Sequence, residues 1–177
     1  LGNESRRPTW QDLKAYPDYQ QALKDAAPVE AVTHTSHLPA AIGAKVACPD
    51  RLAVAVMGDG GFGFMMEELA MACQHQVPVI TIIVNNGYLS LIRQNQRYTY
   101  EFEYGVDLTY NGRGIDFVTL AQAFGAYGER VERTEELRPA FERAVACGRP
   151  AVIDVIVERS TDAAMGNSLD TVREFDG

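Results

Sequence analysis

Three short runs of almost entirely apolar residues divide the chain, at positions 51–57, 79–84 and 151–157. Continuous apolar runs of this length are typical of strands that are buried on both faces of a parallel sheet. Helical patterns flank them at 40–47, 64–75, 115–124 and 135–146. The pattern therefore predicts an α/β fold, doubly wound, with a largely parallel sheet and helices on both faces.

Local signals suggest where several of these helices begin and end. Pro39 suits the first turn of the helix at 40–47. Gly125 is placed to cap the end of the helix at 115–124, and Thr134 to cap the start of the helix at 135–146. Asp154 interrupts the third strand, and the pattern gives it no role.

The ends of the chain are less regular than its middle. We expect a linker and N-terminal helical segment at 1–28, one α/β domain at 29–159, and a polar C-terminal tail at 160–177. A chain of 177 residues is long enough for one domain with a substantial core.

Charge and composition exclude several kinds of partner. The net charge of −8 argues against nucleic acid and against an anionic membrane surface. No apolar run approaches the roughly 18 residues of a membrane span, and the start shows no signal-peptide pattern. The three cysteines have no metal or disulfide spacing, which suits a reducing compartment, so we expect a cytoplasmic location.

The most informative polar residues stand directly after the first two strands. Asp59 lies in the glycine-rich stretch Gly58–Gly63, and Asn86 follows the second strand. Because a strand-helix-strand unit crosses over right-handed, both residues should lie at the carboxyl edge of the sheet. Open α/β sheets bind their ligands at that edge.

Two kinds of ligand could bind here: a dinucleotide, and a diphosphate that is held through a metal ion. The spacing Gly58-x-Gly60-x-x-Gly63 also satisfies the dinucleotide fingerprint, but no acidic residue ends the second strand to hold a ribose. Asp59 would also repel a bare pyrophosphate unless a cation lay between them. The remaining alternative is a glycine-rich turn with a solvated aspartate.

A magnesium ion turns the repulsion into an attraction. Mg²⁺ prefers oxygen ligands and commonly shares them between protein and phosphate. The Asp59 carboxylate, the Asn86 side-chain oxygen and the backbone carbonyl of Tyr88 would supply three ligands. Gly60 and Gly61 would let the backbone approach the phosphates, beside a helix N-terminus. We therefore predict a Mg²⁺–diphosphate site.

Gly58-Asp59-Gly60, followed by Asn85-Asn86, resembles the signature of the thiamin diphosphate (ThDP)-dependent enzymes of the acetolactate synthase-like family. The resemblance implies that this is the domain that binds the cofactor's diphosphate through Mg²⁺. The implied metal ligands are Asp59, Asn86 and Tyr88. The implied cofactor-binding residues are Gly58, Asp59, Gly60, Gly61, Asn86, Tyr88 and Leu89. Many members have a serine where this chain has Gly61.

Within this family, residues 86–97, 104–108 and 158–175 resemble the glyoxylate carboligases, also named tartronate-semialdehyde synthases. The implied reaction condenses two glyoxylate molecules to tartronate semialdehyde with loss of CO2. The alternatives are an acetolactate synthase-like or other 2-oxo acid decarboxylase, the small subunit of a two-subunit enzyme, and a non-catalytic dinucleotide-binding module.

The resemblance also implies partners. A PYR-type domain of a neighbouring subunit would complete the site around a small 2-oxo acid substrate, in a homodimer or homotetramer. The isolated chain is therefore expected to be inactive.

Two further features of this part of the sequence bear on catalysis. The family has a longer segment before Ser36, with a turn that supports the thiazolium ring. Either the chain is naturally shortened here or a mobile loop is absent from this sequence, and we expect the second. No catalytic residue is assigned, and we expect His34 and His37 to be structural or solvated. Arg93 and its polar neighbours could contact an anionic substrate or form a solvated helix face.

Overall fold

The computed structural model describes residues 37–109 and 112–159, so the predictions for 1–28, for His34 and for the tail at 160–177 lie outside the described residues. The strands are β1 (Ala53–Gly58), β2 (Val79–Asn85), β3 (Tyr127–Val131) and β4 (Ala151–Ile156). The helices are α3 (His37–Ala47), α4 (Asp59–Met65), α5 (Glu68–Gln74), α6 (Ser90–Asn95), α7 (Phe117–Ala123) and α8 (Leu137–Ala146). A π-helical turn, η1 (Gln96–Tyr100), follows α6, and a 3-10 turn, η2 (Thr134–Glu136), precedes α8.

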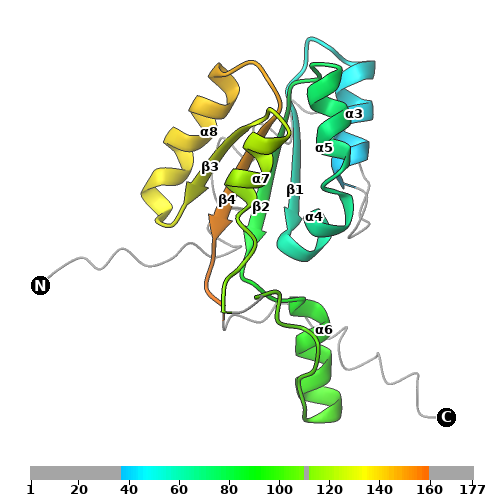
Figure 1. Ribbon diagram of the computed structural model, residues 1–177, viewed down its shortest axis with the longest axis vertical. Coiled ribbons are helices and arrows are strands. Elements are labelled where there is room, and N and C mark those ends of the chain that lie inside the picture. Colours follow the sequence, from blue (N-terminus) through cyan, green and yellow to red (C-terminus); the bar gives the residue numbers. More distant parts are fainter. Residues whose placement is uncertain (1–36, 110–111, 160–177) are drawn as a thin grey trace, which may run out of the picture.

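The four strands form one parallel sheet in the order β1-β2-β4-β3. All arrowheads in Figure 1 point the same way, and α6 projects beyond them. β2 and β4 occupy the centre, which explains why their burial is nearly continuous. The prediction of a parallel α/β sheet is confirmed.

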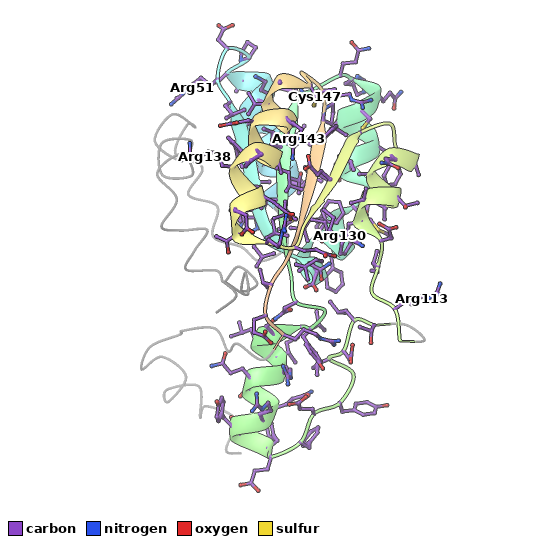
Figure 2. All side chains as sticks on the ribbon, turned by 90° about the vertical axis from the view of Figure 1, so that its left-hand side faces the viewer. Arg51, Arg113, Arg130, Arg138, Arg143 and Cys147 are labelled. Atoms are coloured by element: carbon purple, nitrogen blue, oxygen red, sulfur yellow. The ribbon has the colours of Figure 1, made fainter. Side chains whose placement is uncertain are left out.

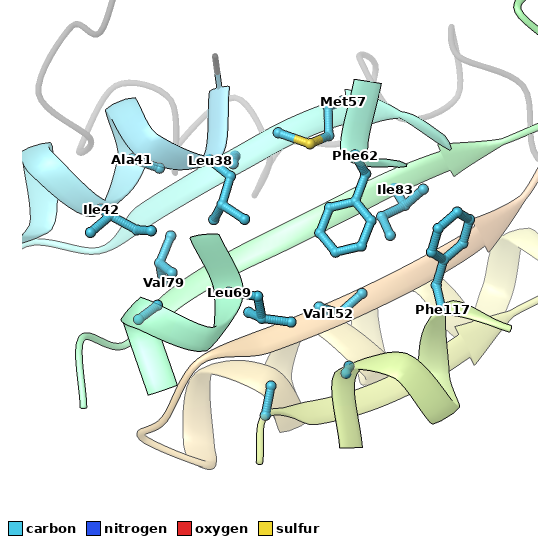
Figure 3. Packing of buried hydrophobic residues seen from close by; sticks show 14 of the residues in the cluster. Leu38, Ala41, Ile42, Met57, Phe62, Leu69, Val79, Ile83, Phe117 and Val152 are labelled. Carbon is cyan, nitrogen blue, oxygen red and sulfur yellow. The ribbon is translucent and has the colours of Figure 1, made fainter. Parts of the chain in front are cut away.

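Helices cover both faces of the sheet, also as predicted. One core cluster joins α3, α4, α5 and α7 to alternate residues of the strands, with Phe62 meeting Phe117 edge to face at a centroid distance of 5.4 Å (Figure 3). The other cluster packs α8 on the opposite face, against Ile153 and Val155. The two clusters alternate along β4, because successive strand residues point to opposite faces.

The region after β1 differs from the prediction. We predicted a glycine-rich turn and then one helix at 64–75, but α4 begins at Asp59 and includes the glycines, and a break at 66–67 separates it from α5. Gly58 is the N-cap in an extended conformation. The glycines therefore form the first turns of a helix that is packed close to neighbouring loops.

Two smaller differences concern the second half of the chain. β3 was not predicted, because this edge strand carries Gly128, Glu129 and Arg130 in its middle. Thr134 does not cap α8; the Glu136 carboxylate instead accepts hydrogen bonds from the N–H groups of Glu132 and Arg133. Among the described residues, no helix has the length and apolar character that crossing a membrane would need.

Candidate functional site

The start of α4, directly after β1, and the loop that follows β2 lie side by side at the carboxyl edge of the sheet. β1 and β2 are parallel neighbours whose register pairs Gly58 with Val84, so Asp59 and Asn86 emerge at the same edge. The structure thus brings together the two side chains that the sequence predicted to be neighbours. Their role as cofactor and metal ligands stays a prediction.

Asp59 is a buried charged side chain at this edge, with only 4% of its surface exposed. Its carboxylate accepts hydrogen bonds from the backbone N–H of Gly60, at 2.9 Å, and of Gly87, at 2.6 Å. Burial raises the pKa of Asp59 to about 6, against the lowering effect of these two hydrogen bonds. A solvated aspartate in a plain turn is therefore the wrong description.

The second loop is a compact turn that presents two oxygens. The side-chain oxygen of Asn86 accepts from the N–H of Tyr88 at 3.1 Å, and its amide nitrogen donates to Ser90 Oγ at 2.5 Å. Ser90 Oγ donates in turn to the carbonyl oxygen of Tyr88 at 3.3 Å. Each of these oxygens has a second lone pair for a cation. Ser90 was not predicted to take part, although its position four residues after Asn86 is a usable signal.

These donor atoms fit a magnesium ion. One carboxylate, one amide oxygen and one main-chain carbonyl are hard oxygen ligands, and Mg²⁺ binds such sets together with phosphate oxygens. Within 37–109 and 112–159, no group of three or more His, Cys, Asp or Glu residues could hold a metal ion. A cation at this edge would therefore depend on the oxygens of Asn86 and Tyr88 as well as on Asp59.

Gly60, in the first turn of α4, and Leu89, in the loop after β2, are in close contact. A Cβ on Gly60 would lie 2.5 Å from Leu89 Cδ2. Leu89 is itself held by a hydrogen bond from its N–H to the carbonyl oxygen of Val106, at 2.9 Å. A side chain at position 60 would therefore displace Leu89. Gly61 lies half-buried in α4.

Tyr88 is held by two arginines. The guanidinium carbon of Arg93 lies 4.1 Å from the centre of the Tyr88 ring, and that of Arg159 lies 4.3 Å from it. Arg93 also donates to the carbonyl oxygen of Arg159 at 3.0 Å and pairs with Glu103. The role of Arg159 was not predicted, because it is distant in sequence.

The polar stretch after Leu91 and Ile92 is not simply a solvated helix face. Gln94 is buried, and the side chain of Gln96 bonds both the N–H and the carbonyl oxygen of Tyr104. The hydrogen bonds of Gln96 hold η1 against the loop that returns toward the site. His37 is the first residue of α3 and is half-buried.

Comparison with known proteins agrees with this geometry. Residues 14–155 match the family model described as "Thiamine pyrophosphate enzyme, C-terminal TPP binding domain". A glyoxylate carboligase of Escherichia coli O157:H7 is 42% identical over an aligned length of 151 residues, and the match covers 78% of this chain and 25% of that protein. The mitochondrial acetolactate synthase catalytic subunit of Saccharomyces cerevisiae is 36% identical over 143 residues, covering 78% of this chain and 20% of the relative.

A solved structure shares the fold. The ThDP-dependent 4-hydroxybenzoylformate decarboxylase of Rhodococcus jostii RHA1 superposes with a TM-score of 0.63 at 36% identity, over 69% of this chain and 23% of the other. The chain thus spans about a quarter or less of the length of these relatives. The family match decides against the dinucleotide-binding alternative. The chain belongs to the thiamine pyrophosphate enzymes, in which it corresponds to the C-terminal, cofactor-binding domain.

Proposed function

We propose that the chain anchors the diphosphate of ThDP through Mg²⁺ in an enzyme that condenses two glyoxylate molecules to tartronate semialdehyde and releases CO2. The observation that carries the cofactor site is the 2.6 Å hydrogen bond from the Gly87 N–H to the Asp59 carboxylate. It joins the start of α4 to the loop after β2, the two segments that carry Asp59, Asn86 and Tyr88.

The chain's own residues bind and orient the cofactor. Asp59, Asn86 and the Tyr88 carbonyl would hold the cation, and the backbone of Gly60 and Gly61 would face the diphosphate. When bound, ThDP supplies the electron sink that decarboxylation of a 2-oxo acid requires. Leu89, packed against Gly60, would limit the access of water and the freedom of the bound cofactor.

The substrate is proposed from similarity. The 42% identity to a glyoxylate carboligase supports glyoxylate. The similarity to an acetolactate synthase supports pyruvate as the second candidate. Because the chain matches only a quarter of the carboligase, we propose that a PYR-type domain of a neighbouring subunit completes the site in a cytoplasmic homodimer or homotetramer.

Calorimetry tests the cofactor part of this proposal. ThDP titrated into the protein should bind in the presence of Mg²⁺ and release on addition of excess chelator. Asp59→Ala should abolish the heat, whereas Asp50→Asn, at an exposed turn, should leave it unchanged. Binding of NAD⁺ that is indifferent to metal would contradict the proposal. Product analysis with glyoxylate and with pyruvate, with a PYR-type domain added, separates the two substrates.

A further inference from the structure

Asp154 is a fully buried carboxylate in the middle of β4, and the proposed function makes no use of it. Its exposed fraction is 0%, and its neighbours along the strand are Ile153 and Val155. Burying a charge among apolar residues is costly unless the charge is paired and hydrogen-bonded. The burial of Asp154 therefore requires partners that offset this cost.

Both oxygens of Asp154 are engaged, one on each side. Oδ1 accepts from the amide nitrogen of Asn85 at 2.9 Å, and Oδ2 accepts from Arg130 Nε at 3.1 Å. Arg130 lies directly beside Asp154 in the register of β3 and β4, and Figure 2 shows it near the carboxyl end of the sheet. These contacts place the carboxylate between the edge strand and the end of β2.

Arg130, the partner of Asp154 on the edge strand, also contacts the start of α7. Arg130 Nη2 lies 3.3 Å from Asp116 Oδ1, and Asp116 caps α7 by accepting from the Thr119 N–H at 3.2 Å. Arg130 is thus held from two sides, and it in turn orients Asp154.

On its other side, Asp154 is linked through Asn85 to the proposed cofactor site. The side-chain oxygen of Asn85 accepts from the Gly87 N–H at 3.2 Å, and the same N–H donates to Asp59 at 2.6 Å. Gly87 has a φ of +71°, a conformation that glycine adopts readily and that side chains disfavour. The main-chain carbonyl of Asn85 also accepts from Val157. Asn85 therefore has little freedom as long as Asp154 holds its amide group.

We propose that Asp154 is a positioning residue that fixes the Asn85 side chain. Asn85 in turn holds the turn at 85–88 in the conformation in which the Gly87 N–H donates to Asp59 and in which Asn86 and Tyr88 face the cation. The positioning of Gly87 stands on the hydrogen bonds alone. The consequence for the cation rests on the proposed function.

A carboxylate is the side chain that this position requires. Asn85 and Arg130 both present N–H donors to position 154, so two acceptor oxygens are needed. Asparagine would satisfy one donor and oppose the other, and leucine would satisfy neither. Stability alone does not explain the carboxylate, since replacing both members of a buried ion pair by apolar residues is often neutral or stabilising. Replacing Asp154 alone leaves Asn85 and Arg130 without their acceptor, so loss of positioning is separated from loss of stability by comparing the Gly87 amide with amides of the core.

The first test follows amide hydrogen exchange by NMR, without Mg²⁺ or ThDP. Asp154→Leu and the isosteric Asp154→Asn should each raise the exchange rate of the Gly87 amide by at least about tenfold, while Ile82 and Val155 in the central strands keep their protection. Glu129→Gln is the matched control: it alters the carboxylate of Glu129, which neighbours Arg130 on β3 and pairs with Arg143 of α8, away from the turn at 85–88. Unchanged Gly87 exchange, or a rise in proportion to that of the core amides, would overturn the proposal.

The second test measures Mg²⁺ affinity at saturating ThDP. Residues that orient metal ligands typically change affinity by about 10–100-fold when they are replaced. Asp154→Asn should weaken Mg²⁺ by about tenfold or more, and Glu129→Gln should not. If the unaltered protein shows no Mg²⁺-dependent binding, the proposed function fails, while the Gly87 exchange still decides the role of Asp154. Full Mg²⁺ affinity in Asp154→Asn would count against the positioning of the cation.

Discussion

Asp59→Asn should reveal how much free energy of unfolding the metal-free protein loses because the Asp59 carboxylate is buried. Burial raises the pKa of Asp59 from its ordinary value of 3.8 to about 6 in the folded state. By linkage, that rise corresponds to about 3 kcal/mol of lost stability at pH values where the carboxylate is ionised in both states. The folded protein takes up a proton below about pH 6, so this cost decreases as the pH falls and disappears below the unfolded value of 3.8.

Urea unfolding from pH 4.5 to pH 7 measures this effect as a difference between the two proteins. The free energy of unfolding of the unaltered protein should decline, relative to Asp59→Asn, by about 2 kcal/mol over that range. Effects of the substitution that do not depend on pH cancel, because only the change of this difference with pH is compared. A flat difference, or one that increases with pH, would refute the reasoning that Asp59 is a desolvated carboxylate.

Three further predictions concern the same site and its support. Gly60→Ala places a Cβ 2.5 Å from Leu89 Cδ2, so calorimetry should show weaker ThDP binding at little cost in stability, whereas Gly63→Ala, with no atom within 4 Å, should bind normally. Gly128→Ala sets a Cβ 2.8 Å from the Val118 carbonyl oxygen, and since backbone cannot easily yield, urea unfolding should show a loss of about 1–3 kcal/mol; Gly43→Ala is the matched control with open space. Mg²⁺ competes with a proton for Asp59, so Mg²⁺-dependent ThDP affinity, corrected for the titration of free ThDP, should fall below about pH 6 by about tenfold per pH unit; affinity that is constant down to pH 5 would contradict this.

Much of the fold follows from local apolar patterns. β1, β2 and β4 coincide with the predicted runs to within two residues, because buried central strands need continuous apolar sequence. The meeting of Asp59 and Asn86 follows as well, since right-handed crossovers place the ends of parallel strands at one edge. Gly125, with a φ of +89°, ends α7 as expected.

Other features depend on contacts that are distant in sequence. β3 is an edge strand, so its polar residues carry no strand pattern. The charge of Asp154 is explained only by Asn85 and Arg130, which lie 69 and 24 positions away. Glycine has a low helix propensity, so the helical start at Asp59 depends on tertiary contacts and could not be predicted from the local sequence.

The most direct measurement of the central claim locates the cation itself. Mn²⁺ can replace Mg²⁺ at oxygen sites, and its paramagnetism broadens NMR signals of nearby nuclei. With ThDP present, Mn²⁺ should broaden the amide signals of Gly60, Gly87 and Tyr88, leave those of Ala140 and Ala144 on α8 sharp, and lose this selectivity in Asp59→Asn. Broadening that is centred elsewhere, or that is the same in Asp59→Asn, would contradict a Mg²⁺–diphosphate site at the ends of β1 and β2.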